Sequence, residues 1–428
     1  MCGNKKSTDV IEPSSFKSRA SPRSSSVGAP SSNNLISNNF STTGSSYKGS
    51  SYSSLSSSTS LSGIKASLPE NPHIYELSEI AAATGNFLRN RFSSSSTSSS
   101  WRCSLRGTEA VVIQRKFRRP IDGPELRHRL LTIGRSHHSS LIKLLGASVS
   151  GNYIYLVYDF VPGVNLADCL RNRRNPSYTI LSTWLSRMQI ATDLAHGLDY
   201  IHHCSGLRSN FVHNHIKSSG IVVTEESMNA RICHFGTSEL CGETVSNVPE
   251  PETSGEITAE KSDGDGGGGG GSKKTLKRSK SRSLKVEGTR GYMAPEFQFT
   301  GIPTQKCDIY AFGVVILELL SGEEPLKYRL EEGTDGGYRR VGVIETARAA
   351  VEGGELRLWI DRRLRDSYPV DVAENMARVG LECVEEDPNK RPDMGRVAVL
   401  VSKMYLESKN WADRIGLPAD ISVSLAPR

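Results

Sequence analysis

The sequence predicts an α+β fold with two unequal parts, a small strand-rich part over about residues 71–161 and a larger helical part over about 162–410. Short β-branched and aromatic runs dominate the first part, whereas long apolar patterns with helical spacing dominate the second. Residues 1–70 hold 24 serines and few large apolar side chains, so we expect a disordered tail there. A second tail is expected at 411–428.

The strand-rich part shows five local patterns. Apolar spacing from Ile74 to Ala81 predicts a short helix, and residues 93–100 are a run of serines with one threonine. Residues 110–113 are β-rich, and residues 125–133 have helical spacing. Residues 153–160 form an aromatic and aliphatic run that stops before a Pro-Gly pair, which predicts a buried strand.

The helical part begins with a long amphipathic pattern. Residues 181–202 and 307–321 carry helical apolar spacing, and residues 221–223 predict a small strand between these two helices. The stretch 322–361 is rich in Gly, Glu and Arg, and we expect loops and helices of the helical part there, with no function assigned to them.

Composition limits where the chain acts. No apolar run approaches the roughly 20 residues that span a bilayer. The N-terminus has no apolar export signal, and the eight cysteines form no CxxC pair or even framework. We therefore expect a cytoplasmic chain that is neither secreted nor transmembrane, with peripheral attachment to the plasma membrane as an alternative.

The formal net charge of +7 is unevenly distributed. Residues 243–265 hold seven acids and one lysine, residues 266–271 are six glycines, and the block 273–285, from Lys273 to Lys285, holds seven basic residues. We expect an insertion loop over about 240–287. The basic block has two open interpretations, a solvated loop with phosphorylatable serines or a patch for anionic membrane or nuclear import. No nucleic-acid partner is expected.

Three strings in the second half carry a family resemblance. Residues 288–296 read Gly-Thr-Arg-Gly-Tyr-Met-Ala-Pro-Glu, residues 308–322 continue Asp-Ile-Tyr-Ala-Phe-Gly through to Ser-Gly, and residues 387–392 read Asp-Pro-Asn-Lys-Arg-Pro. Their order and spacing resemble the C-lobe of a eukaryotic protein kinase. The helix at 190–202 and the Leu-Val-Tyr-Asp-Phe run at 156–160 resemble plant receptor-like kinases, most of all the intracellular domain of LysM-type receptor kinases. The resemblance implies a bilobal fold.

The resemblance also assigns structural roles. It implies a buried ion pair between Glu296 and Arg391, and an Asp308 carboxylate that accepts hydrogen bonds from the catalytic-loop backbone. His213 and Phe235, followed by Gly236, match two positions of the family's hydrophobic spine. These residues predict a fold and carry no chemistry.

The nucleotide cleft departs from the family. No glycine lies between Gly85 and Gly107, so the Gly-rich loop that lets backbone amides approach phosphates is replaced by residues 93–100. Ile113 takes the position of the phosphate-binding lysine, with Gln114 one register away. A larger side chain, Val111, replaces the alanine that faces adenine, and this degenerate cleft also includes Tyr158 and Asp159.

The helix glutamate that pairs with that lysine falls at Arg129, which reverses its charge. A displaced pair between Lys116 and Glu125 is an alternative, because Glu125 lies one helical turn before Arg129.

The catalytic loop and the metal motif are changed as well. His215 replaces the catalytic aspartate and Gly220 the metal-binding asparagine, whereas Lys217 is retained. His234 stands for the aspartate of the Asp-Phe-Gly motif, and imidazole suits Mg²⁺ poorly. We find no other carboxylate near in sequence that could reach the cleft metal. Two neutral histidines are favoured over a zinc or copper site because no third ligand is visible.

The losses predict a pseudokinase that has no metal and binds ATP weakly or not at all. It would act as a scaffold or allosteric partner of active receptor-like kinases or other signalling proteins. One alternative is an active Ser/Thr kinase with a displaced apparatus. Another is an adaptor directed to membrane or nucleus by the basic loop.

Overall fold

The computed structural model describes residues 72–89, 91–94, 98–119, 121–172, 180–207, 209–225, 227–244, 288–330 and 338–416. The chain divides between Ser67 and Leu68 into two units, and every described residue belongs to the second unit. The expected tail at 1–70 and the basic block at 273–285 lie outside the described residues, as does most of the expected insertion.

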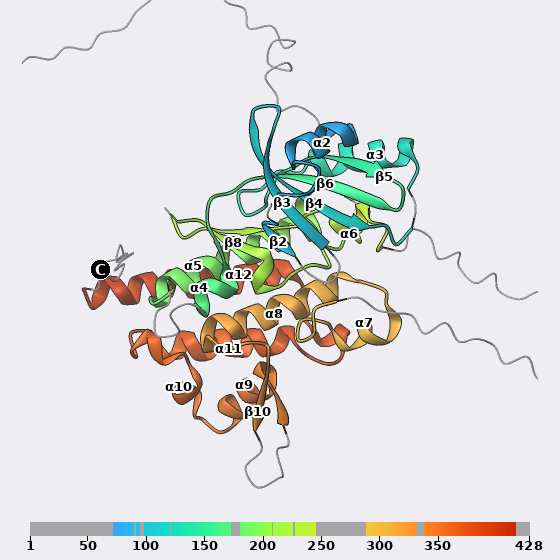
Figure 1. The fold of residues 1–428 in the computed structure, drawn as a ribbon. Helices are drawn as coiled ribbons and strands as arrows, with labels where there is room; N and C mark the ends of the chain where they lie inside the picture. The colour runs from blue at the N-terminus through green and yellow to red at the C-terminus, as the bar shows by residue number, and fades with distance from the viewer. Residues whose placement is uncertain are drawn as a thin grey trace, which may run out of the picture. The chain divides into compact units, whose positions relative to one another are not determined.

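The first part of this unit is a six-stranded sheet in the order β1-β5-β6-β4-β3-β2 (Figure 1). All neighbouring strands are antiparallel except β1 and β5, which are parallel. The strands are β1 His73–Ile74, β2 Ser93–Ser94, β3 Ser98–Leu105, β4 Thr108–Lys116, β5 Leu144–Ser150 and β6 Tyr153–Asp159. The helices are α2 Leu77–Ala83 and α3 Gly123–Gly134.

Two helices cover the two faces of this sheet. Val112 of β4 shares a buried cluster with Ile80 of α2, and its neighbour Ile113 shares another with Leu126 and Leu130 of α3. Alternate residues of a strand point to opposite faces, so one strand serves both clusters. The α3 helix begins where the Asp122 carboxylate accepts a hydrogen bond from the backbone of residue 125.

Two local expectations are corrected. Ile74 lies in β1, where its backbone pairs with Ala147, so the helix starts only at Leu77. The serine run does not form one continuous loop, because Ser98–Leu105 is strand β3 and Ser93–Ser94 pairs with it as β2. Cross-strand pairing with β4 decides both the extent and the register of this segment.

The second part is mostly helical. Its strands are β7 Val164–Asn165, β8 Ile221–Val223, β9 Ala230–Ile232, β10 Leu326–Leu330 and β11 Tyr338–Gly342. Its helices are α4 Leu166–Leu170, α5 Trp184–Asp199, α6 Thr237–Leu240, α7 Pro295–Thr300, α8 Gln305–Ser321, α9 Val343–Glu352, α10 Leu356–Trp359, α11 Val370–Cys383 and α12 Met394–Arg414. The unassigned stretch 322–361 is thus a hairpin followed by two helices, and α12 passes the expected boundary at residue 410.

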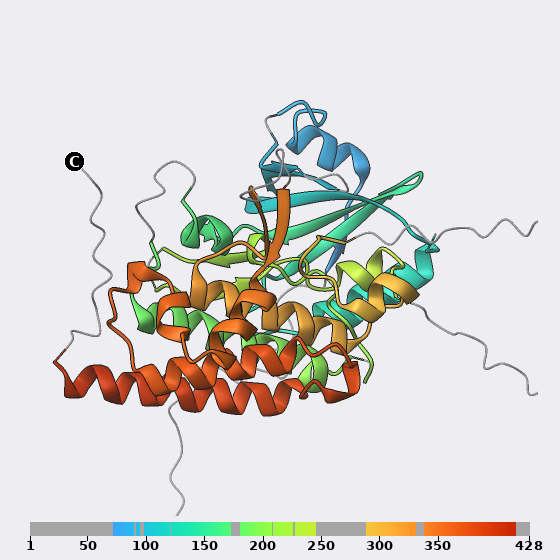
Figure 2. The ribbon, with the colours of Figure 1, turned by 90° about the horizontal axis from the view of Figure 1, so that it is seen from below.

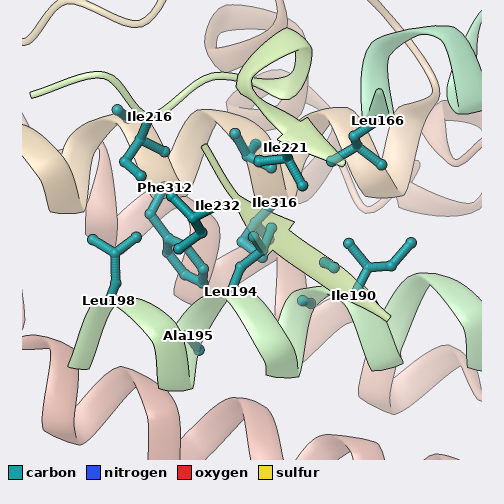
Figure 3. Packing of buried hydrophobic residues seen from close by; sticks show 14 of the residues in the cluster. Leu166, Ile190, Leu194, Ala195, Leu198, Ile216, Ile221, Ile232, Phe312 and Ile316 are labelled. Carbon is teal, nitrogen blue, oxygen red and sulfur yellow. The ribbon is translucent and has the colours of Figure 1, made fainter. Parts of the chain in front are cut away.

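The α8 helix is the centre of this part, and almost all of its side chains are buried. Figure 3 shows Phe312 and Ile316 of α8 facing Leu194 and Leu198 of α5 across a shared apolar layer. The α12 helix runs along α5 on the outside (Figure 2).

Among the described residues, no helix has the length and apolarity to cross a membrane. The predicted α+β architecture is confirmed.

One buried ion pair joins α7 to the start of α12. The Arg391 guanidinium donates two hydrogen bonds to Glu296, with Nη1 2.7 Å from Oε1 and Nη2 2.8 Å from Oε2. The Arg391 side chain has no exposed surface. Its Nε donates to the carbonyl oxygen of Glu385, so all three nitrogen atoms of the guanidinium donate hydrogen bonds.

Arg391→Ala should lower the free energy of unfolding by about 3–5 kcal/mol, because it leaves the Glu296 carboxylate without its partner. Arg378→Ala is the matched control, since Arg378 pairs with Glu374 on the surface of α11 and should change stability by less than about 1 kcal/mol. Urea denaturation measures both. Equal losses in the two variants would contradict the structural role of Arg391.

Candidate functional site

Ile113 and Gln114, the two residues considered for the lysine position, point to opposite faces of β4. Ile113 is buried against α3, whereas the Gln114 amide points to the opposite face and donates to the Tyr155 hydroxyl at 3.1 Å. Ile113 is therefore the residue that faces the cleft, and Gln114 is turned away from it. The next residue on the cleft face is Arg115.

Arg129, predicted to stand at the family's glutamate position, lies on α3 and pairs with a neighbour on the same helix. Its Nε lies 2.6 Å from Glu125 Oε1, and its Nη1 donates to the carbonyl oxygen of Glu239 at 2.5 Å. The displaced pair between Lys116 and Glu125 is not formed, because Glu125 binds Arg129 and Lys116 lies exposed at the end of β4. The helix is tied instead to α6, which follows the His-Phe-Gly motif.

The catalytic-loop backbone is held by the buried Asp308 of α8. Its two carboxylate oxygens accept hydrogen bonds from the backbone N–H groups of His213 and Asn214, each at 2.7 Å. His202 Nε2 lies 3.1 Å from the same carboxylate. His213 Nε2 also contacts the carbonyl oxygen of Cys233 at 2.9 Å, so this loop keeps its frame.

The substituted positions lie together. The ring centroids of His215 and His234 are 6.0 Å apart. A Cβ added at Gly220 would lie 3.5 Å from Lys217 Cγ and 3.8 Å from His234 Cδ2. The structure thus brings Gly220, His215, Lys217 and His234 into one small region, at the meeting point of the two parts.

One carboxylate in this region was missed by sequence reasoning. Glu243 Oε2 lies 3.0 Å from His215 Nε2 and accepts a hydrogen bond from Asn214 Nδ2 at 3.0 Å, while Oε1 accepts one from Arg115 Nη2 at 3.3 Å. The expectation that no carboxylate reaches the cleft is wrong. Glu243 opens the acidic block 243–265, which composition assigned to a solvated loop, so only its position shortly after the His-Phe-Gly motif could have indicated it.

The electrostatics favour a charged Glu243 and neutral His213 and His234. Burial would raise the pKa of Glu243, but His215 and Arg115 together hold it well below its usual range. Burial lowers the pKa of His213 to about 4, against the opposing effect of Asp308. Burial lowers the pKa of His234 as well, and the nearby His215 and Arg115 add to this effect.

His234 is also unusual in its backbone and its hydrogen bonding. Its φ of 66° lies in the left-handed region, which short polar side chains such as Asn and Asp adopt more readily. Its Nδ1 is buried and has no hydrogen-bond partner among the described residues.

Tyr158 connects β6 to the His-Phe-Gly motif. Its buried hydroxyl donates to the carbonyl oxygen of Phe235 at 2.9 Å and lies 2.9 Å from Thr237 Oγ1. Burial raises its pKa far above the ordinary value. Val111 packs against the apolar cluster that includes Tyr158. Asp159 is the last residue of β6, and its backbone N–H donates to the carbonyl oxygen of Lys143. The Tyr158 hydroxyl therefore holds the Phe235–Gly236 segment, and its hydrogen bonds are not available to a ligand.

A cavity of about 150 Å³ lies beside these residues. It is bounded by β4, the catalytic loop, Glu243, the segment 288–294 and the start of α8. Its charged side chains are Arg115, Arg118, Lys217, Glu243 and Asp308. Neither Val111 nor the end of β6 lines it.

The residues do not fit the magnesium site of a kinase. Gly220 has no side chain to offer, His234 is a neutral imidazole, and Glu243 is already bound by three side chains. Mg²⁺ requires oxygen ligands in near-octahedral geometry. Within the described residues, no group of three or more His, Cys, Asp and Glu side chains is placed to hold a metal ion.

Comparisons with known proteins agree with the fold. A family model described as protein tyrosine and serine/threonine kinase matches residues 110–256 and 272–401. LysM domain receptor-like kinase 3 of Arabidopsis thaliana is 30% identical over 348 residues, which cover 80% of this chain and 48% of that protein. Chitin elicitor receptor kinase 1 of the same plant is 31% identical over 353 residues, 82% of this chain and 49% of that protein. The chain spans about half the length of these curated relatives.

A solved structure is similar in fold. The pseudokinase domain of BIR2, described as an immune regulator of the RLK/Pelle family, superimposes with a TM-score of 0.56 at 22% identity. The match covers 82% of this chain and 93% of that domain.

The buried histidines predict acid-sensitive stability. His213 and His234 have lower pKa values in the folded chain than the ordinary 6.5, so the unfolded chain binds more protons below neutral pH. The free energy of unfolding should therefore fall as pH drops from about 6.5 toward about 4, by up to about 1.4 kcal/mol per pH unit for each histidine. Urea denaturation as a function of pH measures this slope.

The matched variant is His234→Asn, because asparagine tolerates the left-handed backbone and does not titrate. It should show a shallower slope between pH 4 and 6.5 than the unchanged chain. An identical slope would mean that His234 is not held neutral.

Proposed function

This chain belongs to the protein tyrosine and serine/threonine kinase family, and we propose that it is a pseudokinase of the plant receptor-like kinase type that acts by binding other signalling proteins. One observation carries the proposal. Ile113, Gly220 and His234 stand at the positions where a kinase has its phosphate-binding and metal-binding groups, while the structural frame around them is retained. That frame includes Asp308 and the Glu296–Arg391 pair.

Phosphoryl transfer demands held phosphates, bound Mg²⁺ and an oriented acceptor hydroxyl. Ile113 is an aliphatic side chain packed on α3, so the strand presents no ammonium at the phosphate position. The catalytic-base position, His215, has its Nε2 directed to Glu243 at 3.0 Å. Each of the three demands therefore lacks the group that usually meets it.

The contacts of the cleft support a closed arrangement. Glu239 and Glu243 follow the His-Phe-Gly motif and are bound by Arg129 of α3 and Arg115 of β4. The phenol of Tyr158 adds a third link from the sheet to this segment. A segment held at three points is suited to presenting a fixed surface to a partner. We propose active receptor-like kinases as the partner class, since the relatives are kinases of that kind.

One observation favours a second candidate, an active Ser/Thr kinase with an atypical site. Glu243 places a carboxylate in the cleft, and carboxylates bind Mg²⁺. Use of Glu243 as a metal ligand would require it to leave Arg115, Asn214 and His215. The test below separates the two candidates.

Attachment to an anionic membrane through the block Lys273 to Lys285, or a nuclear role of that block, stays a separate proposal, because it lies outside the described residues.

The purified chain should show no autophosphorylation and no rise in melting temperature with ATP and Mg²⁺ or Mn²⁺. A ligand that binds the folded state must raise its stability by mass action, so an unchanged melting temperature reports absent binding. The double variant Gly220→Asn with His234→Asp should gain a Mg²⁺-dependent shift, because it restores two oxygen ligands.

Phosphate transfer would instead decide for the second candidate, the active kinase. Phosphate transfer by the unchanged chain that is lost in Glu243→Gln would establish the second candidate and exclude a pseudokinase. Glu374→Gln is the matched control, since that surface glutamate lies on α11, away from the cleft.

A further inference from the structure

The turn between α10 and α11 presents two arginines without a partner. Arg362 and Arg365 are exposed, and the side chain of neither forms a hydrogen bond or an ion pair within the described part of the chain. The nearby Arg357 differs, since its Nε lies 3.5 Å from Asp366 Oδ1. None of these residues lines the cavity beside the catalytic loop, so the turn is separate from the candidate site.

The backbone of this turn is anchored to the helical core. The Asp361 carboxylate accepts hydrogen bonds from the buried Arg187 at 2.6 Å and from Arg363 Nε at 2.8 Å. At the other end, the N–H of Ser367 donates to the carbonyl oxygen of Leu364 at 2.9 Å. The two unpaired arginines therefore extend from a fixed backbone, which lowers the entropy lost when a partner binds them.

The backbone conformation of the turn is unusual for its residue types. Arg365 and Asp366 are consecutive residues with φ of 51° and 55°, in the left-handed region. An arginine adopts this region at a cost in free energy that glycine would avoid. Such strain concentrates at functional sites, so an arginine at this position indicates a use for its side chain.

Exposed apolar side chains flank the two arginines. Leu358 of α10 is 70% exposed, and Val370, the first residue of α11, is 47% exposed. The ion pair between Arg357 and Asp366 brings α10 against the turn, and Leu358 directly follows Arg357. Arginine beside apolar side chains is typical of protein–protein interfaces.

The charge of the turn indicates an acidic partner, and the number of cations indicates a protein. A planar guanidinium binds a carboxylate through two parallel hydrogen bonds. An anionic membrane attracts a protein by about 1 kcal/mol per basic residue, and lipid-binding segments carry clusters of about four to eight. Two unpaired arginines are too few for a membrane but match two carboxylates of a peptide.

We propose that the turn surface, formed by Leu358, Arg362, Arg365 and Val370, docks an acidic segment of a partner protein. Each arginine would bind one carboxylate, and an apolar side chain of the segment would pack on Leu358 or Val370. Docking there needs neither nucleotide nor metal. The inference rests on the proposed function in one respect, since it takes the chain to act by binding other proteins.

Selection from a random library of displayed peptides tests this proposal on the full chain. Peptides are retained if they bind the chain but not the double variant Arg362→Gln with Arg365→Gly. The retained peptides should share acidic residues next to an apolar one. By fluorescence anisotropy, each single substitution should weaken a retained peptide about tenfold, and so should glutamine in place of one of its glutamates.

Arg365→Gly separates a binding role from a structural one. Glycine adopts the left-handed conformation without a steric cost, so this variant should keep or raise the melting temperature while it loses affinity. If it folds poorly, Arg362→Gln decides. Arg127→Gln is the matched control, because Arg127 is an exposed arginine of α3, and it should leave affinity unchanged.

Three results would overturn the proposal. The first is that no peptide distinguishes the chain from the double variant, and the second is that the retained peptides lack acidic residues. The third is sedimentation of the chain with phosphatidylserine vesicles that is lost in the double variant, which would make this surface a membrane contact. None of them bears on catalysis, which the Mg²⁺-ATP assay decides separately.

Discussion

The arrangement of the cleft depends on the Asp308 carboxylate, buried in α8. Because α8 is the centre of the helical core, its side chains have little freedom, and Asp308 presents two oxygens in fixed positions. The backbone of His213 and Asn214 is held against them at 2.7 Å. A buried carboxylate without these donors would be costly, so the loop and the helix need each other. The backbone of this loop is therefore held in place whatever side chains it carries.

Two arginines hold the frame from the side of the sheet. Arg129 provides a cation on α3, and Arg115 provides one on β4 beyond Ile113. Both find their partners, Glu239 and Glu243, in the segment after the His-Phe-Gly motif. The ion pairs of Arg129 and Arg115 therefore hold the segment after the His-Phe-Gly motif against α3 and β4. In a kinase, charged groups between the two parts align a nucleotide instead. Since these groups are largely buried, their attraction is weakly screened.

The neutral histidines complete this picture. Burial lowers the pKa of the His234 imidazole, so this side chain carries no charge at neutral pH, whereas an aspartate there would add a negative charge to the cleft. Arg115 is paired with Glu243, and the Lys217 ammonium donates to the Thr289 hydroxyl at 3.3 Å.

The sequence by itself determined the family and the α+β order, and it predicted the missing groups, because Glu296, Asp308, Arg391 and the His-Phe-Gly motif lie in short strings whose spacing is diagnostic. Only the tertiary structure decided that Ile113 faces the cleft while Gln114 does not, and that the serine run pairs as strands, because register depends on neighbouring strands. It alone also placed Glu243 beside Arg115. These residues lie 128 positions apart, and an ion pair over such a distance leaves no local periodicity to detect.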